Sequence, residues 1–348
     1  MIKYIYNTSP YKVKKNNFDF LRLLLASTVF MVHLYDLTEF PVLSFFNYYL
    51  SSNFAIKSFF VISGFLIFMS YEKSSTLNNY LIKRFLRIYP AYFFIIFITT
   101  VSFYFISSVD LLSYYSIDLL RYLICNLLFL NFLEPTLPGV FEFNNINAVN
   151  GALWTLKIEV MFYLTIPFFV YLFNRYNHLL IIIFTYLASI LYTQILLNLF
   201  KDTNLDIYLF LARQLPGQLS YFMIGAFLYY FYDYLYPKNT IILLLIASLI
   251  LLFNNFIILP YLEPLALGIL IITISTSFYI GNYSNYGDFS YGIYIVHFPI
   301  IQLLYSMGII NRYPFYFVLL SIITVSLISI ILWHGIEKKF LKKKSMFK

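Results

Sequence analysis

The chain has 348 residues, of which 61% are apolar and only 11% are charged. A soluble domain carries roughly 25% charged residues, so this composition excludes a soluble globular protein and predicts a chain that crosses a membrane many times. The single cysteine, Cys125, excludes an internal disulfide. The net charge of +8 is explained by the membrane topology described next, and we expect no nucleic-acid binding.

The apolar stretches predict an all-α, polytopic membrane bundle of about ten transmembrane helices, because a helix needs about 20 mostly apolar residues to cross the hydrocarbon. The N-terminus lacks the pattern of a cleaved signal peptide, so the first stretch is expected to remain as a span. Pro216 and Gly217 interrupt the sixth stretch and predict a broken helix. The predicted spans are 18–38, 54–71, 88–108, 154–173, 179–199, 208–232, 240–258, 262–280, 289–307 and 315–335.

Lysine and arginine residues indicate the orientation of these spans. With the N-terminus inside, sixteen of them fall in cytoplasmic segments and three on the opposite side. We therefore expect both termini to be cytoplasmic, with residues 1–17 as an N-terminal tail, 18–337 as one transmembrane domain and 338–348 as a basic tail. The longest connection, 109–153, is expected outside, and its middle is apolar enough to lie in the membrane interface.

Two polar side chains share one face of the first span. Arg22 and His33 are eleven residues apart, which places them within about 20° of each other around the helix and roughly 16 Å apart along its axis. Charges inside a span are costly and usually face the protein interior. Asp19 lies one turn before Arg22 and can pair with it. The alternative is that Arg22 reaches the cytoplasmic headgroups and His33 caps the helix end.

A second basic pair, Arg84 and Arg87, lies one turn apart at the cytoplasmic end of the third span. Two guanidiniums on one face suit a phosphorylated ligand that arrives from the cytoplasm. Ordinary anchoring by the positive-inside rule explains the two residues equally well.

Two further polar groups lie deep in later spans. Glu159 lies about one turn into the fourth span, where a carboxylate needs a cation or hydrogen-bond donors, and a buried ion pair with another span is the alternative. His297 lies near the middle of the ninth span, next to a kink expected at Pro299. A second deep imidazole is hard to explain by packing alone.

Together these features resemble the acyltransferase-3 family of membrane-bound O-acyltransferases, from Asp19 to Glu337. Two features depart from the family pattern: Lys338, rather than a proline, follows Glu337, and the chain ends at Lys348 without an esterase-like domain, so a stand-alone transferase is expected. The residues that carry the resemblance are Asp19-x-x-Arg22 with His33, Phe59 to Phe65, Arg84-x-x-Arg87-x-Tyr89-Pro90, Trp154 with Glu159 and Tyr163, Arg213 with Phe222 and Gly225, and Ser290-Tyr291 with Tyr294, His297 and Pro299.

The resemblance implies an O-acetyltransferase of the inner (cytoplasmic) cell membrane, multi-pass in the lipid bilayer. It implies acetyl-CoA, or another acyl-CoA, as a donor taken from the cytoplasm, and a hydroxyl of a surface glycan or its lipid-linked precursor as acceptor. No metal is expected. Direct transfer and an acyl-enzyme intermediate both remain open.

Within this family hypothesis, His33 is the expected base, since the ordinary pKa of an imidazole is about 6.5. Arg22, Arg84 and Arg87 are expected to hold the donor's phosphates. Glu159 is expected to orient His33 or an arginine, and His297 is a second candidate for the base. Further candidate site residues are Asp19, Trp154, Tyr163, Arg213 and Tyr294.

Two other functions are compatible with a polytopic chain rich in aromatic residues. A glycan polymerase or flippase has a similar number of spans and intramembrane arginines, but does not require the patterns at 154–163 and 290–299. A secondary transporter can use deep His and Glu side chains to relay protons, but the sequence shows no inverted repeat.

Overall fold

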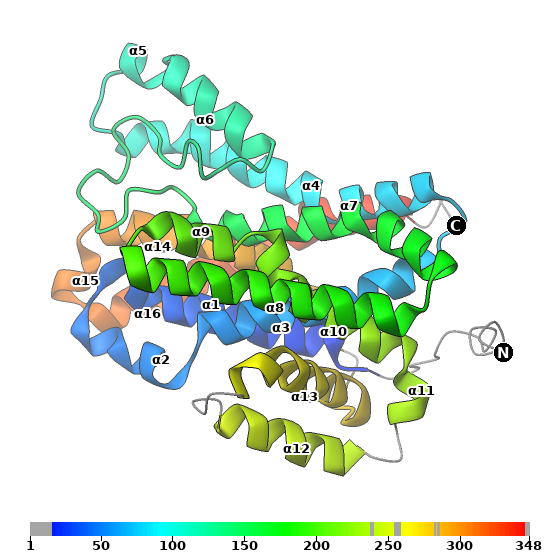
Figure 1. Ribbon diagram of the computed structural model, residues 1–348. Coiled ribbons are helices and arrows are strands. Elements are labelled where there is room, and N and C mark those ends of the chain that lie inside the picture. Colours follow the sequence, from blue (N-terminus) through cyan, green and yellow to red (C-terminus); the bar gives the residue numbers. More distant parts are fainter. Residues whose placement is uncertain (1–15, 237–239, 254–258, 282, 284–285, 345–348) are drawn as a thin grey trace. The chain divides into compact units, whose positions relative to one another are not determined.

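The computed structural model describes residues 16–236, 240–253, 259–281, 283 and 286–344. All regular structure in these residues is helical, in agreement with the all-α prediction (Figure 1). Most of the predicted N-terminal tail, the end of the seventh predicted span at 254–258, and the last four residues lie outside the described ranges.

Each predicted span contains a helix in the described residues, but the helix of the third span begins at Leu77, eleven residues before the predicted start at 88. The α-helices of the first half are α1 (Phe18–Thr38), α2 (Ser44–Tyr49), α3 (Ser52–Glu72), α4 (Leu77–Ser102), α5 (Leu111–Tyr114), α6 (Ile117–Leu127) and α7 (Trp154–Arg175). Those of the second half are α8 (His178–Thr203), α9 (Asp206–Ala212), α10 (Leu215–Tyr230), α11 (Tyr232–Leu235), α12 (Thr240–Leu252), α13 (Glu263–Ser277), α14 (Ser290–Ser306), α15 (Ile309–Arg312), α16 (Pro314–Leu332) and α17 (Lys338–Lys344). Single turns of 3-10 helix lie at Pro41–Leu43, Phe103–Ile106, Gly151–Leu153 and Leu259–Leu262, and a π-helical turn, η7, lies at Trp333–Glu337.

Six helical segments in the described part of the chain are long and apolar enough to cross a membrane. The protein is therefore a membrane helical bundle. The four remaining predicted spans correspond to α10, α12, α13 and α14, which are shorter, at 13 to 17 residues. The six long segments are Phe18–Thr38, Pro41–Glu72, Leu77–Ile106, Gly151–Arg175, His178–Thr203 and Pro314–Lys342.

The sixth predicted span is broken, as the sequence indicated. Helix α9 ends at Ala212, and α10 begins at Leu215 with Pro216 in its first turn. A proline is tolerated there because the first N–H groups of a helix have no intrahelical partner.

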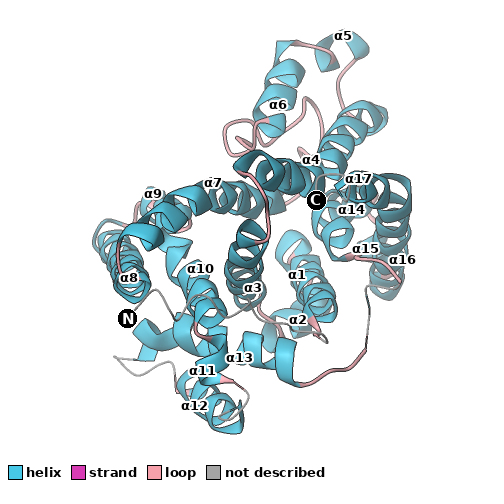
Figure 2. Cartoon of the chain, turned by 90° about the vertical axis from the view of Figure 1, so that its right-hand side faces the viewer, coloured by secondary structure: helices cyan, strands magenta, loops and turns pink. Residues whose placement is uncertain are grey.

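The chain divides into two compact units whose segments alternate along the sequence. The first unit comprises the described parts of Met1–Leu21, Lys57–Leu77 and Ile158–Asn285, and the second comprises those of Arg22–Ile56, Asn78–Lys157 and Tyr286–Lys348. In both units the helices are joined by loops and turns (Figure 2).

The first unit is held by tight helix packing and by paired charges. Helices α3 and α10 meet backbone to backbone, because a Cβ on Gly64 would lie 2.0 Å from the carbonyl oxygen of Phe222. Small residues at membrane helix contacts allow such close approach. The intramembrane charge of Lys57 is paired with Glu263 of α13, with 2.7 Å between Nζ and Oε1. These contacts bind the helices of this unit to one another.

Candidate functional site

The second unit brings the two deep histidines together, although they are 264 residues apart in the sequence. His33 of α1 and His297 of α14 form a hydrogen bond, with 2.8 Å between His33 Nδ1 and His297 Nε2. His297 is fully buried and His33 is half-buried. We call these two residues the imidazole pair.

The protons of the imidazole pair follow from its hydrogen bonds. His297 Nδ1 lies 3.0 Å from the carbonyl oxygen of Ile293, and a carbonyl can only accept, so Nδ1 of His297 carries the hydrogen. In the neutral ring, Nε2 of His297 is then the acceptor and His33 Nδ1 must donate to it. The remaining nitrogen, Nε2 of His33, therefore carries a lone pair and can accept a proton from a third group.

Aromatic rings surround the imidazole pair. Phe30 and Tyr294 lie 6.1 and 5.8 Å from His297 between ring centroids, and Phe298 packs edge-on against His33 at 5.9 Å. Tyr294 is held in turn by a 2.6 Å hydrogen bond to the Thr155 hydroxyl. Such surroundings exclude water, so polar interactions within them are stronger than in solvent.

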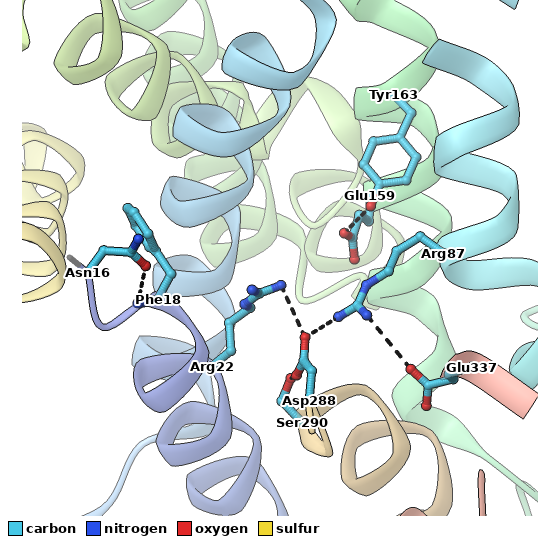
Figure 3. Close-up of polar contacts among 9 residues, drawn as sticks. All are labelled: Asn16, Phe18, Arg22, Arg87, Glu159, Tyr163, Asp288, Ser290 and Glu337. Atoms are coloured by element: carbon cyan, nitrogen blue, oxygen red, sulfur yellow. Dashed lines mark hydrogen bonds and ion pairs between the residues drawn. The ribbon is translucent and has the colours of Figure 1, made fainter. Parts of the chain in front are cut away.

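The second polar centre of this unit is built around Asp288, just before α14 (Figure 3). Arg87 of α4 binds Asp288 Oδ2 directly, and Arg22 Nη1 lies 3.4 Å from the same oxygen. The Ser290 hydroxyl donates to Oδ1 over 2.5 Å. Arg87 also reaches Glu337 Oε2 at 3.8 Å. We call Arg22, Arg87, Asp288 and Glu337 the ionic cluster.

The ionic cluster contains two guanidiniums and two carboxyl groups. The side chain of Asp288 is only 9% exposed. Burial alone would raise the pKa of Asp288, but the charges of Arg87 and Arg22 and the hydrogen bond from Ser290 hold it well below its usual range. Asp288 is therefore ionised and holds two arginines side by side.

Glu337 is the most buried member of the cluster. It closes the π-helical turn after α16 and is 2% exposed. Neither carboxylate oxygen of Glu337 accepts a hydrogen bond within the residues that the structure describes, so Arg87 at 3.8 Å is its nearest ion-pair partner. Single π turns occur often at functional positions.

The imidazole pair and the ionic cluster both join α1 to the segment that contains α14. Arg22 faces Asp288, and eleven residues later His33 faces His297. The two segments therefore run in the same direction, with the two polar centres roughly 16 Å apart along α1. The shared face that the sequence predicted for Arg22 and His33 thus faces protein in the second unit.

Arg84 and Trp154 are two more predicted site residues that lie in the second unit. Tyr294 lies in the same unit, beside His297. Arg84 is half-buried on α4, with its guanidinium 5.9 Å from the ring centroid of Tyr80. Trp154 is the first residue of α7 and is half-buried.

The remaining predicted residues belong to the first unit. Glu159 accepts a 2.5 Å hydrogen bond from the hydroxyl of Tyr163, one turn later on α7, so its donor comes from its own helix. Arg213 is exposed at the break between α9 and α10. Asp19 lies in the first turn of α1.

Sequence reasoning did not identify Asp288 as a site residue. It lies in a short connection, where an acidic residue is ordinary. The arginines that it binds come from the first predicted span and from the residue just before the third. A usable signal is Arg22, since an arginine inside a span requires a carboxylate from elsewhere in the chain. No group of three or more His, Cys, Asp or Glu side chains suited to a metal ion occurs within the described ranges.

A family model described as an acyltransferase domain matches residues 15–334. The chain is 27% identical over 338 residues to an O-acetyl transferase of Shigella phage Sf6, covering 95% of this chain and 98% of that protein. It is 28% identical over 172 residues to Nodulation protein 10 of Rhizobium leguminosarum bv. viciae, covering 47% and 46%. No solved structure matches the chain.

Proposed function

Because the chain belongs to the acyltransferase-3 family and is a membrane O-acyltransferase, we propose that it moves an acetyl group from cytoplasmic acetyl-CoA to a hydroxyl of a surface glycan or its lipid-linked precursor. The observation that carries this proposal is the imidazole pair, which leaves one basic nitrogen on His33 in an aromatic, largely buried setting. The acetyl group is favoured over longer chains because the phage relative is named an O-acetyl transferase.

In the proposed reaction, His33 Nε2 takes the proton of the acceptor hydroxyl as the oxygen attacks the thioester carbonyl. The carbon–sulfur bond breaks, the CoA thiolate leaves, and the proton passes from His33 to the thiolate. The products are an acetyl ester and CoA with its thiol. His297 keeps His33 in the tautomer that this step needs.

The donor's phosphates are proposed to bind at the ionic cluster and at Arg84. Asp288 holds Arg22 and Arg87 side by side, and the planar fork of five N–H donors on a guanidinium suits phosphate oxygens. The spacing of about 16 Å along α1 suits a donor whose nucleotide lies near one end of the helix and whose thioester lies near His33. The net positive charge of this region is smaller than the sequence suggested, because the ionised Asp288 contacts both arginines.

The other sequence candidates remain proposals with smaller roles. Tyr294 is proposed to keep His297 in place from one side, because its ring packs against that imidazole. Glu159 is proposed to act together with Tyr163, its hydrogen-bond partner. Further positions carried over from the family resemblance are Asp19, Trp154 and Arg213.

We further propose a topology of ten spans with both termini in the cytoplasm, in the inner membrane of the cell. The six long helical segments account for six spans, and α10, α12, α13 and α14 would supply the other four. In this arrangement α1 and α14 are odd-numbered spans and run in the same direction, as the paired contacts of the second unit require. The single transmembrane domain, 18–337, and the two tails remain part of this proposal.

The test is transfer of radiolabel from acetyl-CoA to glycan in membranes that contain the chain. Wild-type membranes should label a lipid-linked or polymeric glycan, and glycan NMR from producing cells should show new acetyl esters. In sealed right-side-out vesicles, radiolabelled acetyl-CoA supplied inside should label the glycan, and the same compound supplied outside should not. A glycan polymerase or flippase would change glycan length or location without label, and a transporter would take up solute without either effect.

A further inference from the structure

The loop before α7 is fastened to α14 by buried amide groups. Gln302 of α14 is fully buried and donates to the carbonyl oxygens of Ile146 and Ala148. Its own Oε1 accepts from Asn144 Nδ2 at 2.9 Å. The loop therefore keeps a fixed position against the helix that carries His297.

Asn150, at the end of this loop, supplies a hydrogen-bond donor that a proline removes from α14. In a regular helix, the carbonyl of Ile295 would accept from the N–H of residue 299, but residue 299 is a proline and has none. Asn150 Nδ2 supplies the missing donor, at 2.8 Å from the Ile295 oxygen. Because that carbonyl can only accept, the orientation of the Asn150 amide is fixed.

The other end of the same amide is left without a donor. Asn150 is 8% exposed, and its Oδ1 is buried with no hydrogen bond among the residues that the structure describes. Buried polar atoms are normally satisfied, and leaving one unsatisfied is costly. A ligand with an O–H group would satisfy this oxygen.

The position of Asn150 connects it to the imidazole pair. The next residue, Gly151, touches Phe298 so closely that a Cβ there would lie 2.8 Å from the ring. The same ring packs edge-on against His33, at 5.9 Å between centroids. Gly151, the residue next to Asn150, and His33 thus contact the same aromatic ring, which places Asn150 in the neighbourhood of the imidazole pair.

We propose that Asn150 Oδ1 binds a second hydroxyl of the acceptor, next to the hydroxyl that is acylated. This inference rests on the proposed function and narrows it, because it requires an acceptor with at least two hydroxyl groups close together, as in a sugar. A monohydric acceptor would leave the Asn150 oxygen unsatisfied.

The experiment uses the full chain in proteoliposomes with radiolabelled acetyl-CoA. The acceptor is the lipid-linked glycan fraction extracted from producing cells and titrated by dilution. Asn150→Ala should raise the half-saturating acceptor concentration about three- to tenfold, the range expected for one neutral hydrogen bond. The KM for acetyl-CoA should stay within twofold of wild type.

Two matched variants separate acceptor binding from loop stability. Asn144→Ala loosens the same loop but removes no unsatisfied oxygen, so it should lower the unfolding temperature without raising the acceptor requirement. Asn150→Asp keeps an oxygen at this position, and in its protonated form its hydroxyl can donate to the Ile295 carbonyl in place of the amide, so at acidic assay pH it should recover most of the acceptor affinity that Asn150→Ala loses. This variant also decides the matter if Asn150→Ala does not fold.

The inference is overturned if Asn150→Ala leaves the acceptor requirement unchanged, as a buried water at Oδ1 would produce. It is also overturned if Asn144→Ala and Asn150→Asp raise the requirement as much as Asn150→Ala does, since the loop alone would then be responsible. Failure of the wild type to label any glycan fraction would instead count against the proposed function.

Discussion

The imidazole pair and the ionic cluster join the same two segments of the chain, yet they differ in whether a reactive group remains after their own contacts are made. The cluster holds two guanidiniums beside two carboxyl groups, and charges inside a membrane protein are usually paired. The pair consists of two neutral imidazoles. One basic nitrogen, His33 Nε2, takes no part in the hydrogen bonds of the pair. Anchoring explains the cluster well, whereas a single neutral hydrogen bond, worth about 0.5–1.5 kcal/mol, is a weak reason to bury two imidazoles.

This difference predicts that substitutions in the pair will reduce turnover, and substitutions in the cluster will reduce stability first. Substitutions of His33, Arg87, His297 and Asp288 test this difference between turnover and stability.

The largest expected effect is on turnover in His33→Ala. Loss of a positioned general base should lower kcat about 10²- to 10⁴-fold, while the thermal unfolding temperature in detergent changes little. The matched control is His334→Ala, which removes an exposed imidazole and should keep normal turnover. An active, normally expressed His33→Ala protein would end the assignment of the base.

The next effect is on stability, in Arg87→Ala. Removing this guanidinium takes away the ion-pair contact of Glu337 and leaves Asp288 with Arg22, and breaking a buried ion pair in this way costs about 3–5 kcal/mol. The control is Arg121→Ala, whose partner Asp118 lies 3.2 Å away with both side chains at least 60% exposed. Such surface pairs contribute at most about 1 kcal/mol. Comparable unfolding midpoints for the two variants would show that the cluster is not an anchor.

The same comparison shows what the sequence could predict. The helices were predicted because apolar stretches of about 20 residues are an unambiguous signal in a membrane protein. His33, Arg22 and His297 were identified individually, since each is a costly side chain inside a span. Their contacts were not, because the partners lie more than 260 residues apart and helix periodicity carries no information about which helices meet.

The structure adds partners for Arg87 and Glu159 that the sequence did not specify. Arg87, which is predicted to serve a phosphorylated ligand, also contacts two carboxyl groups. Glu159 is expected to need a cation or hydrogen-bond donors, and its donor is Tyr163 on the same helix. The partners of Arg87 come from other segments of the chain, and the partner of Glu159 depends on the side-chain conformation on its own helix. Both depend on packing, which the local sequence pattern does not specify.

A smaller effect on turnover is expected when His297 is changed. His297→Leu removes the acceptor for His33 Nδ1–H and should lower kcat roughly ten- to a hundredfold, the usual range for losing an orienting partner. His297→Gln can still accept through its amide oxygen and should restore much of this loss. The KM for acetyl-CoA should be unchanged in both. Equal loss in both variants, together with lowered unfolding temperatures, would indicate a packing role instead.

The smallest expected effect is the pH response of Asp288. Because its pKa in the folded protein lies well below the ordinary value of about 3.9, the stability it contributes is fully present above that value and is lost only as the pH falls through the folded pKa. The comparison is made in a Glu337→Gln background, so that Asp288 is the one carboxyl of the cluster that titrates, since Arg22 and Arg87 remain charged throughout. The gap in unfolding temperature between Glu337→Gln and Glu337→Gln with Asp288→Asn should stay constant from pH 8 to pH 5 and narrow only below about pH 4. A gap that already narrows between pH 7 and pH 5 would mean that the arginines do not hold Asp288 ionised, and the ionic cluster would then lose its role as a fixed anchor between α1, α4 and α14.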